Sequence, residues 1–129
     1  MKSFTTTDSN RAGTHTWLTP KYFFDELGKF DLDPCAAPMP RPFDTACTMW
    51  SEAEKDGLKE KWFGRVWLNP PYGKYGSEWL RKLEEHGNGI ALIFARTDTR
   101  WLQPILQRNS LFFLQGRVSF LLPNGDISK

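Results

Sequence analysis

The sequence has few cysteines, no long apolar run and almost no excess charge, and each shortage excludes a class of protein. Its two cysteines, Cys35 and Cys47, form no C-x-x-C pair and lack the neighbouring ligands that a zinc site needs. We therefore expect reduced thiols, as in cytoplasmic proteins, and no metal. No apolar segment approaches the roughly 20 residues that span a bilayer, and the first residues lack the apolar core of a signal peptide. A cytoplasmic protein without a membrane partner is expected.

The charges nearly balance, with 17 Lys and Arg against 15 Asp and Glu. Such a chain has no dense basic tail, so any contact with nucleic acid is expected to be local. A length of 129 residues with 40% hydrophobic residues is enough for one core and too short for two comfortable domains. We expect a mobile polar leader over residues 1–16 and one domain over residues 17–129. The sequence leaves the oligomeric state open.

Helix and strand patterns alternate along the chain. Thr19-Pro20 predicts a helix start, with Thr19 as its cap, and Gly28 predicts its end. A second and a third helix are predicted over residues 77–86 and 99–107. Strands are predicted over residues 30–34, 46–50, 65–68, 89–95, 111–114 and 118–122, whereas the proline-rich residues 36–44 are not expected to form a helix. Ser51 followed by Glu54 resembles a capping box.

This alternation predicts an α/β sheet of mostly parallel strands with helices on both faces. Residues 89–95 are almost wholly apolar, so we expect them to form a central strand buried on both faces. The last two strands are expected to add an antiparallel contribution. A turn signal at residues 123–126 has no partner strand after it, so the sheet is expected to be truncated at its C-terminal strands.

The loop Asn69-Pro70-Pro71-Tyr72 follows a predicted strand and carries the strongest chemical signal. The exocyclic amine of adenine is a poor nucleophile because its lone pair is delocalised into the ring. If the Asn69 side-chain oxygen and the Pro70 carbonyl each accept one amine hydrogen, the lone pair is drawn out of the ring and can attack a methyl donor. The loop is thus a candidate catalytic site.

The neighbours of Asn69 and Pro70 suit the same task. Consecutive prolines stiffen the loop and remove backbone donors, so Pro71 holds Pro70 in place. Tyr72 can stack on a base extruded from the duplex. The alternative is that the four residues are only a polar turn after a strand.

With these segments in view, the chain resembles the phage and prophage DNA adenine-N6 methyltransferases of the Dam type. They belong to the Rossmann-like, S-adenosylmethionine-dependent methyltransferases. The resemblance runs through residues 17–20, 30–36, 56–58, 62, 66–73, 95–101 and 116–120. It implies a Rossmann-like methyltransferase sheet and methyl transfer from S-adenosyl-L-methionine to adenine in double-stranded DNA.

The resemblance also implies a cofactor site. By it, Asp33, Pro34, Cys35 and Ala36 line the methionine end of the cofactor, and Asp33 holds the cofactor's ammonium group. Thr19-Pro20 matches a segment beside the same pocket, and Asp56 matches an acidic position that accepts a hydrogen bond from the cofactor's adenine. Alternatively, Asp33 ends a strand, Thr19 caps a helix and Asp56 opens an Asp-Gly turn.

Two features depart from the general pattern of nucleotide-binding folds. No phosphate-cradling glycine pattern follows Leu32, although S-adenosylmethionine has no phosphate that would require it. The segment between Asp33 and Asp56 is proline-rich and short for a strand, a helix and a return strand. A reduced cofactor site or a weak cofactor affinity is compatible with this shortness.

Arg96 and Arg100 are candidate DNA contacts because they follow the strand over residues 89–95, at the sheet edge that carries the catalytic loop. The alternative is an ordinary solvated helix start, with Thr97 or Asp98 as cap. Other proteins also fit the loop: methyltransferases that act on RNA or on protein glutamine, and a noncatalytic nucleic-acid-binding phage accessory protein on the same fold.

Overall fold

A small parallel sheet forms the centre of the computed structural model, which describes residues 18–71 and 75–127. Its strands lie in the order β2 (Thr48–Met49), β1 (Leu32–Asp33), β3 (Val66–Leu68) and β4 (Gly89–Ala91). All neighbouring strands are parallel, and Val66 is paired with Leu32 on one side and with Gly89 on the other. The prediction of an α/β fold with a parallel sheet is confirmed.

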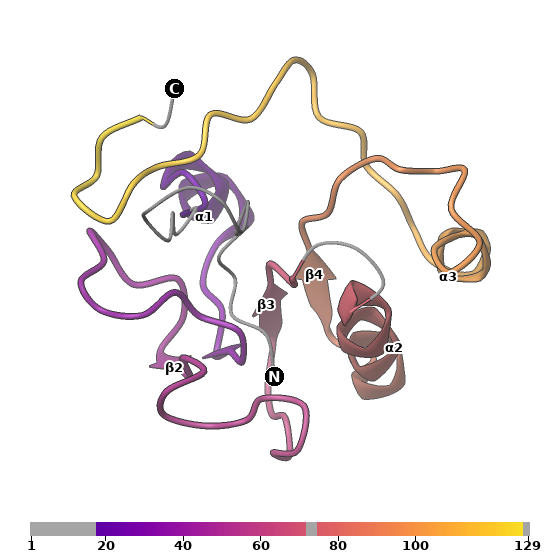
Figure 1. Ribbon diagram of the computed structural model, residues 1–129, viewed down its shortest axis with the longest axis horizontal. Coiled ribbons are helices and arrows are strands. Elements are labelled where there is room, and N and C mark those ends of the chain that lie inside the picture. The colour runs from indigo at the N-terminus through magenta and orange to yellow at the C-terminus, as the bar shows by residue number, and fades with distance from the viewer. Residues whose placement is uncertain (1–17, 72–74, 128–129) are drawn as a thin grey trace, which may run out of the picture.

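Helices lie on both faces of this sheet (Figure 1). The side chains of β3 alternate between two cores, one on each face. Trp67 packs with Phe23 and Phe24 of α1 (Tyr22–Leu27), with a ring-centroid distance of 4.9 Å to Phe24. Val66 and Leu68 face the opposite core. That core contains residues of α2 (Gly76–His86) and of α3 (Gln103–Arg108). The three residues of β3 are at most 1% exposed, so this strand is the buried axis of the domain.

Local signals predicted several boundaries correctly. Gly87 ends α2 in a left-handed conformation, with φ of 77°, and its N–H donates to the Leu83 carbonyl. Half of the predicted capping box forms: the Ser51 N–H and hydroxyl both donate to the Glu54 carboxylate, at 2.8 and 2.9 Å, while the Glu54 N–H donates to the Ser51 backbone carbonyl. At the first helix the prediction was wrong in detail, because α1 begins at Tyr22 and Thr19 does not cap it.

The prediction that residues 89–95 form a central strand buried on both faces is wrong. Among the described residues, β4 is paired with β3 alone and lies at one edge of the sheet. Gly89 is exposed, and Ile90 and Ala91 are partly exposed. An apolar run indicates how much surface can be buried, but not the position of its strand in the sheet.

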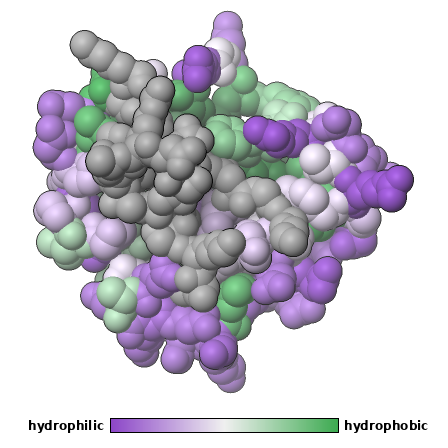
Figure 2. All heavy atoms as spheres, in the orientation of Figure 1, coloured by the Kyte–Doolittle hydropathy of each residue, from purple (hydrophilic) through white to green (hydrophobic). Residues whose placement is uncertain are grey.

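The predicted strands over residues 111–114 and 118–122 are also absent from the described part of the chain. Antiparallel pairing here is confined to single bridges that join Leu121 to Leu18 and to Ile127. Phe112 is 92% exposed and Phe113 is 76% exposed, and apolar residues reach the surface in the upper part of the face in Figure 2. Strand propensity depends on a partner edge, and these residues have none among those described.

The remaining expectations concern the leader, the cysteines, membrane spans and metal sites. The expected leader over residues 1–16 lies outside them. Cys35 and Cys47 are both free. In the described ranges, no helix is long and apolar enough to cross a membrane, and no three His, Cys, Asp or Glu residues gather as a metal site would require.

Candidate active site

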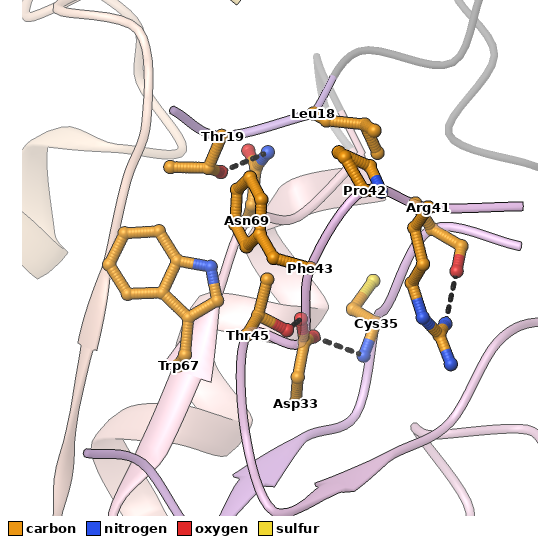
Figure 3. A pocket seen from close by; sticks show the side chains of 11 residues that line it. Leu18, Thr19, Asp33, Cys35, Arg41, Pro42, Phe43, Thr45, Trp67 and Asn69 are labelled. Carbon is orange, nitrogen blue, oxygen red and sulfur yellow. Dashed lines mark hydrogen bonds between the residues drawn. The ribbon is translucent and has the colours of Figure 1, made fainter. Parts of the chain in front are cut away.

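A pocket lies where the two central strands end. Because β1 and β3 are parallel neighbours, their carboxyl ends meet at one edge of the sheet. Asp33 is the last residue of β1, and Asn69 follows the last residue of β3. Both line the pocket in Figure 3. The other lining residues are Leu18, Thr19, Cys35, Ala37, Arg41, Pro42, Phe43, Thr45 and Trp67.

Asp33 is a buried carboxylate, only 4% exposed. One oxygen accepts a hydrogen bond from the Cys35 N–H at 3.1 Å, and the other accepts one from the Thr45 hydroxyl at 2.5 Å. Burial raises the pKa of Asp33 to about 6, although both hydrogen bonds and the nearby Arg41 guanidinium lower it. Near neutral pH the Asp33 carboxylate is therefore mostly ionised, and it shares the pocket with the Arg41 guanidinium.

The Asn69 side chain is held from a distant part of the chain. Its Nδ2 donates to the Thr19 hydroxyl oxygen at 3.3 Å, across 50 positions of sequence (Figure 3). Thr19 is 4% exposed, and its neighbour Leu18 is bridged to Leu121 by two backbone hydrogen bonds of 2.8 Å. One N–H of the Asn69 amide is thus bound to protein, and the amide oxygen is the atom that can accept from a ligand.

Arg41 lines the same pocket, and its Nε is buried without a hydrogen-bond partner in the described part of the structure. Its Nη1 donates to the Ala37 carbonyl at 2.5 Å. Sequence reasoning missed Arg41, Phe43 and Thr45 because they lie in or beside the proline-rich stretch, which has no periodicity. The only available signal was the position of that stretch, directly after the β1 carboxyl end.

The chain as a whole can now be compared with known proteins. A model of the family described as DNA N-6-adenine-methyltransferase (Dam) matches residues 5–129. The chain belongs to the Dam family. A DNA N-6-adenine-methyltransferase of Escherichia phage T1 is 33% identical over 95 residues. The aligned region is 66% of this chain but only 38% of the phage T1 protein, so the chain spans well under half of that relative. No solved structure matches.

Among the predicted cofactor residues of this Dam-family chain, the structure brings Thr19, Asp33 and Cys35 together around the pocket. Pro34 and Ala36, the sequence neighbours of Cys35, are buried but do not line the pocket. Pro20 directly follows Thr19 and is also buried.

Asp56 lies away from the pocket lining. Its carboxylate accepts from the Leu58 N–H at 3.1 Å and is 3.5 Å from the Lys59 ammonium. This is the geometry of an Asp-Gly turn. The next residue, Gly57, nevertheless packs against the Pro34 carbonyl, which brings the turn beside the β1 end.

The loop over residues 69–72, predicted to be catalytic, is described only in part. Pro70 is buried and Pro71 is half-buried, and neither lines the pocket. Tyr72 lies outside the described residues. The Pro71 carbonyl packs closely on Gly76, where an added Cβ would be 2.7 Å from the oxygen, so the start of α2 supports the loop.

Arg96 and Arg100 follow β4, which is parallel to β3, so both come after the carboxyl end of a strand at the same sheet edge. Both residues are exposed. The backbone N–H of Arg96 donates to the Phe94 carbonyl, and its carbonyl accepts from Thr99. Neither arginine lines the pocket.

Proposed function

We propose that this chain is an S-adenosylmethionine-dependent methyltransferase domain that methylates the N6 amine of adenine in double-stranded DNA. One observation carries the proposal: in a Dam-family chain, a buried carboxylate and the asparagine of an Asn-Pro-Pro-Tyr loop line one pocket at adjacent strand ends. The fold is then a Rossmann-like methyltransferase sheet, with the domain over residues 17–129 and a leader before it.

The chemistry of the pocket fits the amino-acid end of the cofactor. S-adenosylmethionine is cationic at its ammonium and sulfonium groups, and Asp33 offers a buried carboxylate to a cation. The rings of Phe43 and Trp67 line the same hollow, and aromatic faces attract cations. In the proposal, Asp33 binds the ammonium group, while Pro34, Cys35 and Ala36 shape the adjoining wall. Thr19, Pro20 and Asp56 remain proposed members of the cofactor site.

When bound, S-adenosylmethionine supplies a methyl group on a positively charged sulfur. Asn69 Oδ1 and the Pro70 carbonyl accept the two hydrogens of the adenine amine and draw its lone pair out of the ring. Pro71 keeps the loop rigid, and Tyr72 stacks on the flipped base. With the cofactor's ammonium group held by Asp33, the methylated amine would release one proton to water.

Arg96 and Arg100 are the proposed phosphate contacts. Both are exposed and follow a strand that ends at the same edge as β3, so backbone phosphates beside a base held at Asn69 would be within their general reach. Contacts to phosphates position DNA without reading its sequence. Replacing both by alanine should weaken binding to all DNA sequences alike and reduce its dependence on salt.

The first test is calorimetric titration of S-adenosylmethionine and S-adenosylhomocysteine into the purified chain, with Asp33→Ala and the control Asp25→Ala. Asp25 is exposed and pairs only with Lys21 in the described structure. The proposal expects micromolar binding that is lost in Asp33→Ala and kept in Asp25→Ala. Absence of binding at millimolar ligand would instead favour a noncatalytic relative.

The second test is transfer of labelled methyl groups to adenine-containing duplex DNA, single-stranded DNA and RNA. Asn69→Ala should lower kcat by about 100-fold to 1,000-fold, the usual loss when one transition-state hydrogen-bond partner is removed. Transfer to RNA alone would refute the DNA substrate while keeping the chemistry.

A further inference from the structure

We infer that Arg41 binds the carboxylate of the cofactor's amino-acid end, so that Arg41 and Asp33 together recognise a zwitterion. The inference rests on the proposed function, because it takes S-adenosylmethionine as the ligand of the pocket. It adds a second charged contact to that site, and with it a means of rejecting adenosine derivatives that have no amino-acid end.

Two groups of opposite charge line the pocket without forming a salt bridge. Asp33 and Arg41 both belong to its wall, and the guanidinium lowers the pKa of Asp33 through space. Among the described residues, however, no ion pair includes either side chain. Cys35 lies between them in the view of Figure 3. The pocket therefore offers a site for a cation and a site for an anion side by side.

The Arg41 guanidinium is only partly satisfied by the protein. The described ranges supply one acceptor for it, the Ala37 carbonyl, at 2.5 Å from Nη1. Nε is buried and has no hydrogen-bond partner there, and a buried donor without a partner costs free energy. The acceptor that suits an arginine best is a carboxylate, which can take two parallel N–H bonds from the planar fork.

Arg41 is also held where it can meet a ligand. Ala37, which accepts from Nη1, lines the pocket itself, so this end of the guanidinium lies at the wall. Pro42 and Phe43 directly follow and line the pocket too, and the Pro42 ring restricts the backbone beside Arg41. The side chain is partly buried, and partial burial strengthens its attraction for an opposite charge.

The amino-acid end of S-adenosylmethionine carries the matching pair of charges. Its ammonium and carboxylate groups are bonded to the same carbon atom, so placing one group limits where the other can lie. With the ammonium at Asp33 and the carboxylate at Arg41, each charge of the pocket gains a partner. A ligand without the carboxylate would leave the guanidinium uncompensated.

The test compares S-adenosylhomocysteine with two analogues, one that lacks only the carboxylate and one that lacks only the ammonium group. Calorimetric titration gives the Kd of each ligand for the unaltered chain, Arg41→Gln and Asp33→Asn. In the unaltered chain, loss of the carboxylate should weaken binding about 10-fold to 100-fold, the usual worth of a charge-assisted hydrogen bond. In Arg41→Gln the same loss should change the Kd less than about threefold.

Two variants serve as controls. Asp33→Asn should show the crossed pattern: it still discriminates against the ligand without the carboxylate, but no longer against the ligand without the ammonium group. Arg81→Gln removes the same charge as Arg41→Gln from an exposed position of α2 outside the pocket lining. It should bind all three ligands like the unaltered chain.

Several outcomes would overturn the role of Arg41. If the unaltered chain binds the ligand without the carboxylate as tightly as S-adenosylhomocysteine, the inference fails, whether or not the variants fold. It also fails if Arg41→Gln weakens all three ligands by the same factor, because Arg41 would then only support the pocket wall. Absence of binding of every ligand at millimolar concentration would overturn the proposed function as well. A carboxylate preference that depends on Arg41, without methyl transfer to DNA, would refute the DNA substrate and support the role of Arg41.

Discussion

Gly57 packs so closely on Pro34 that an added Cβ would lie 2.1 Å from the Pro34 carbonyl oxygen. This contact ties the turn at Asp56 to the carboxyl end of β1, where Asp33 lines the pocket. The same Cβ would also be 2.8 Å from the Trp79 ring of α2. One glycine thus lets a loop, a strand end and a helix meet behind the site.

Gly57→Ala should therefore destabilise the domain by about 1–3 kcal/mol, the usual cost of overpacking, because the obstacle is backbone and cannot rotate away. Urea unfolding followed by tryptophan fluorescence measures it. Gly87→Asn is the matched control, since Gly87 has open space around it and asparagine tolerates its left-handed conformation. If both variants unfold at the same urea concentration, the close contact with Pro34 is not a constraint in solution.

Lys82 should hold the other side of the same turn. Its ammonium donates to the carbonyls of Gly57, Leu58 and Glu60 at 3.2, 2.7 and 2.5 Å, and desolvation lowers its pKa. Lys82→Met removes three charge-assisted bonds and should cost about 1–2 kcal/mol in the free energy of unfolding. Thermal unfolding of Lys59→Met serves as comparison, because Lys59 is largely exposed. Equal losses in the two variants would contradict a structural role for Lys82.

The sequence predicted the part of the site that is formed by residues at the ends of parallel strands. Asp33 and Asn69 each come at the end of a predicted strand, and the carboxyl ends of parallel strands meet at one edge of a sheet, so their proximity was predictable. The pocket lining from Arg41 to Thr45 was not predictable, because a proline-rich segment follows a path that no helical or strand periodicity in the sequence indicates. The exposed Phe112 and Phe113 show the same limit, since an apolar run predicts a strand only where a partner edge exists.

Replacing Asp33 should stabilise the fold at neutral pH, although it removes the proposed cofactor contact. Folding raises the pKa of Asp33 from 3.8 to about 6, so its stabilising contribution is complete below pH 3.8 and is lost as the pH rises through 6. Asp33→Asn has no carboxylate to ionise and so avoids this loss. The free energy of unfolding of Asp33→Asn minus that of the unaltered chain should therefore be about 2 kcal/mol larger at pH 7.5 than at pH 4.5. Urea unfolding at the two pH values tests it, with the exposed Asp25→Asn as control. A gain that does not depend on pH would show that Asp33 ionises normally.

Cofactor binding should show the opposite dependence on pH. The proposed ammonium contact needs the ionised carboxylate, and at pH 5 only about a tenth of Asp33 is ionised if its pKa is near 6. S-adenosylmethionine should therefore bind about tenfold more weakly at pH 5 than at pH 7. Calorimetric titration at both values gives the ratio. Equal affinity at pH 5 and pH 7 would place the ammonium elsewhere.

Thr45 should affect the pKa of Asp33. Its hydroxyl donates to the Asp33 carboxylate, and this hydrogen bond is the strongest of the influences that lower the Asp33 pKa. Thr45→Val keeps the branched shape but removes the donor, so the pKa of Asp33 should rise above 6, whereas Thr45→Ser should leave it close to 6. Carbon-13 NMR of the Asp33 carboxyl follows the pKa directly.

The consequence of the Thr45→Val change lies in cofactor binding at mildly acidic pH. A higher Asp33 pKa leaves less carboxylate at pH 6.5, so Thr45→Val should bind S-adenosylmethionine more weakly than the unaltered chain at that pH. The two affinities should become equal at pH 8.5, where Asp33 is ionised in both proteins. If Thr45→Val binds equally weakly at both pH values, then Thr45 contacts the ligand itself. Its hydroxyl would then serve the cofactor and not the charge of Asp33.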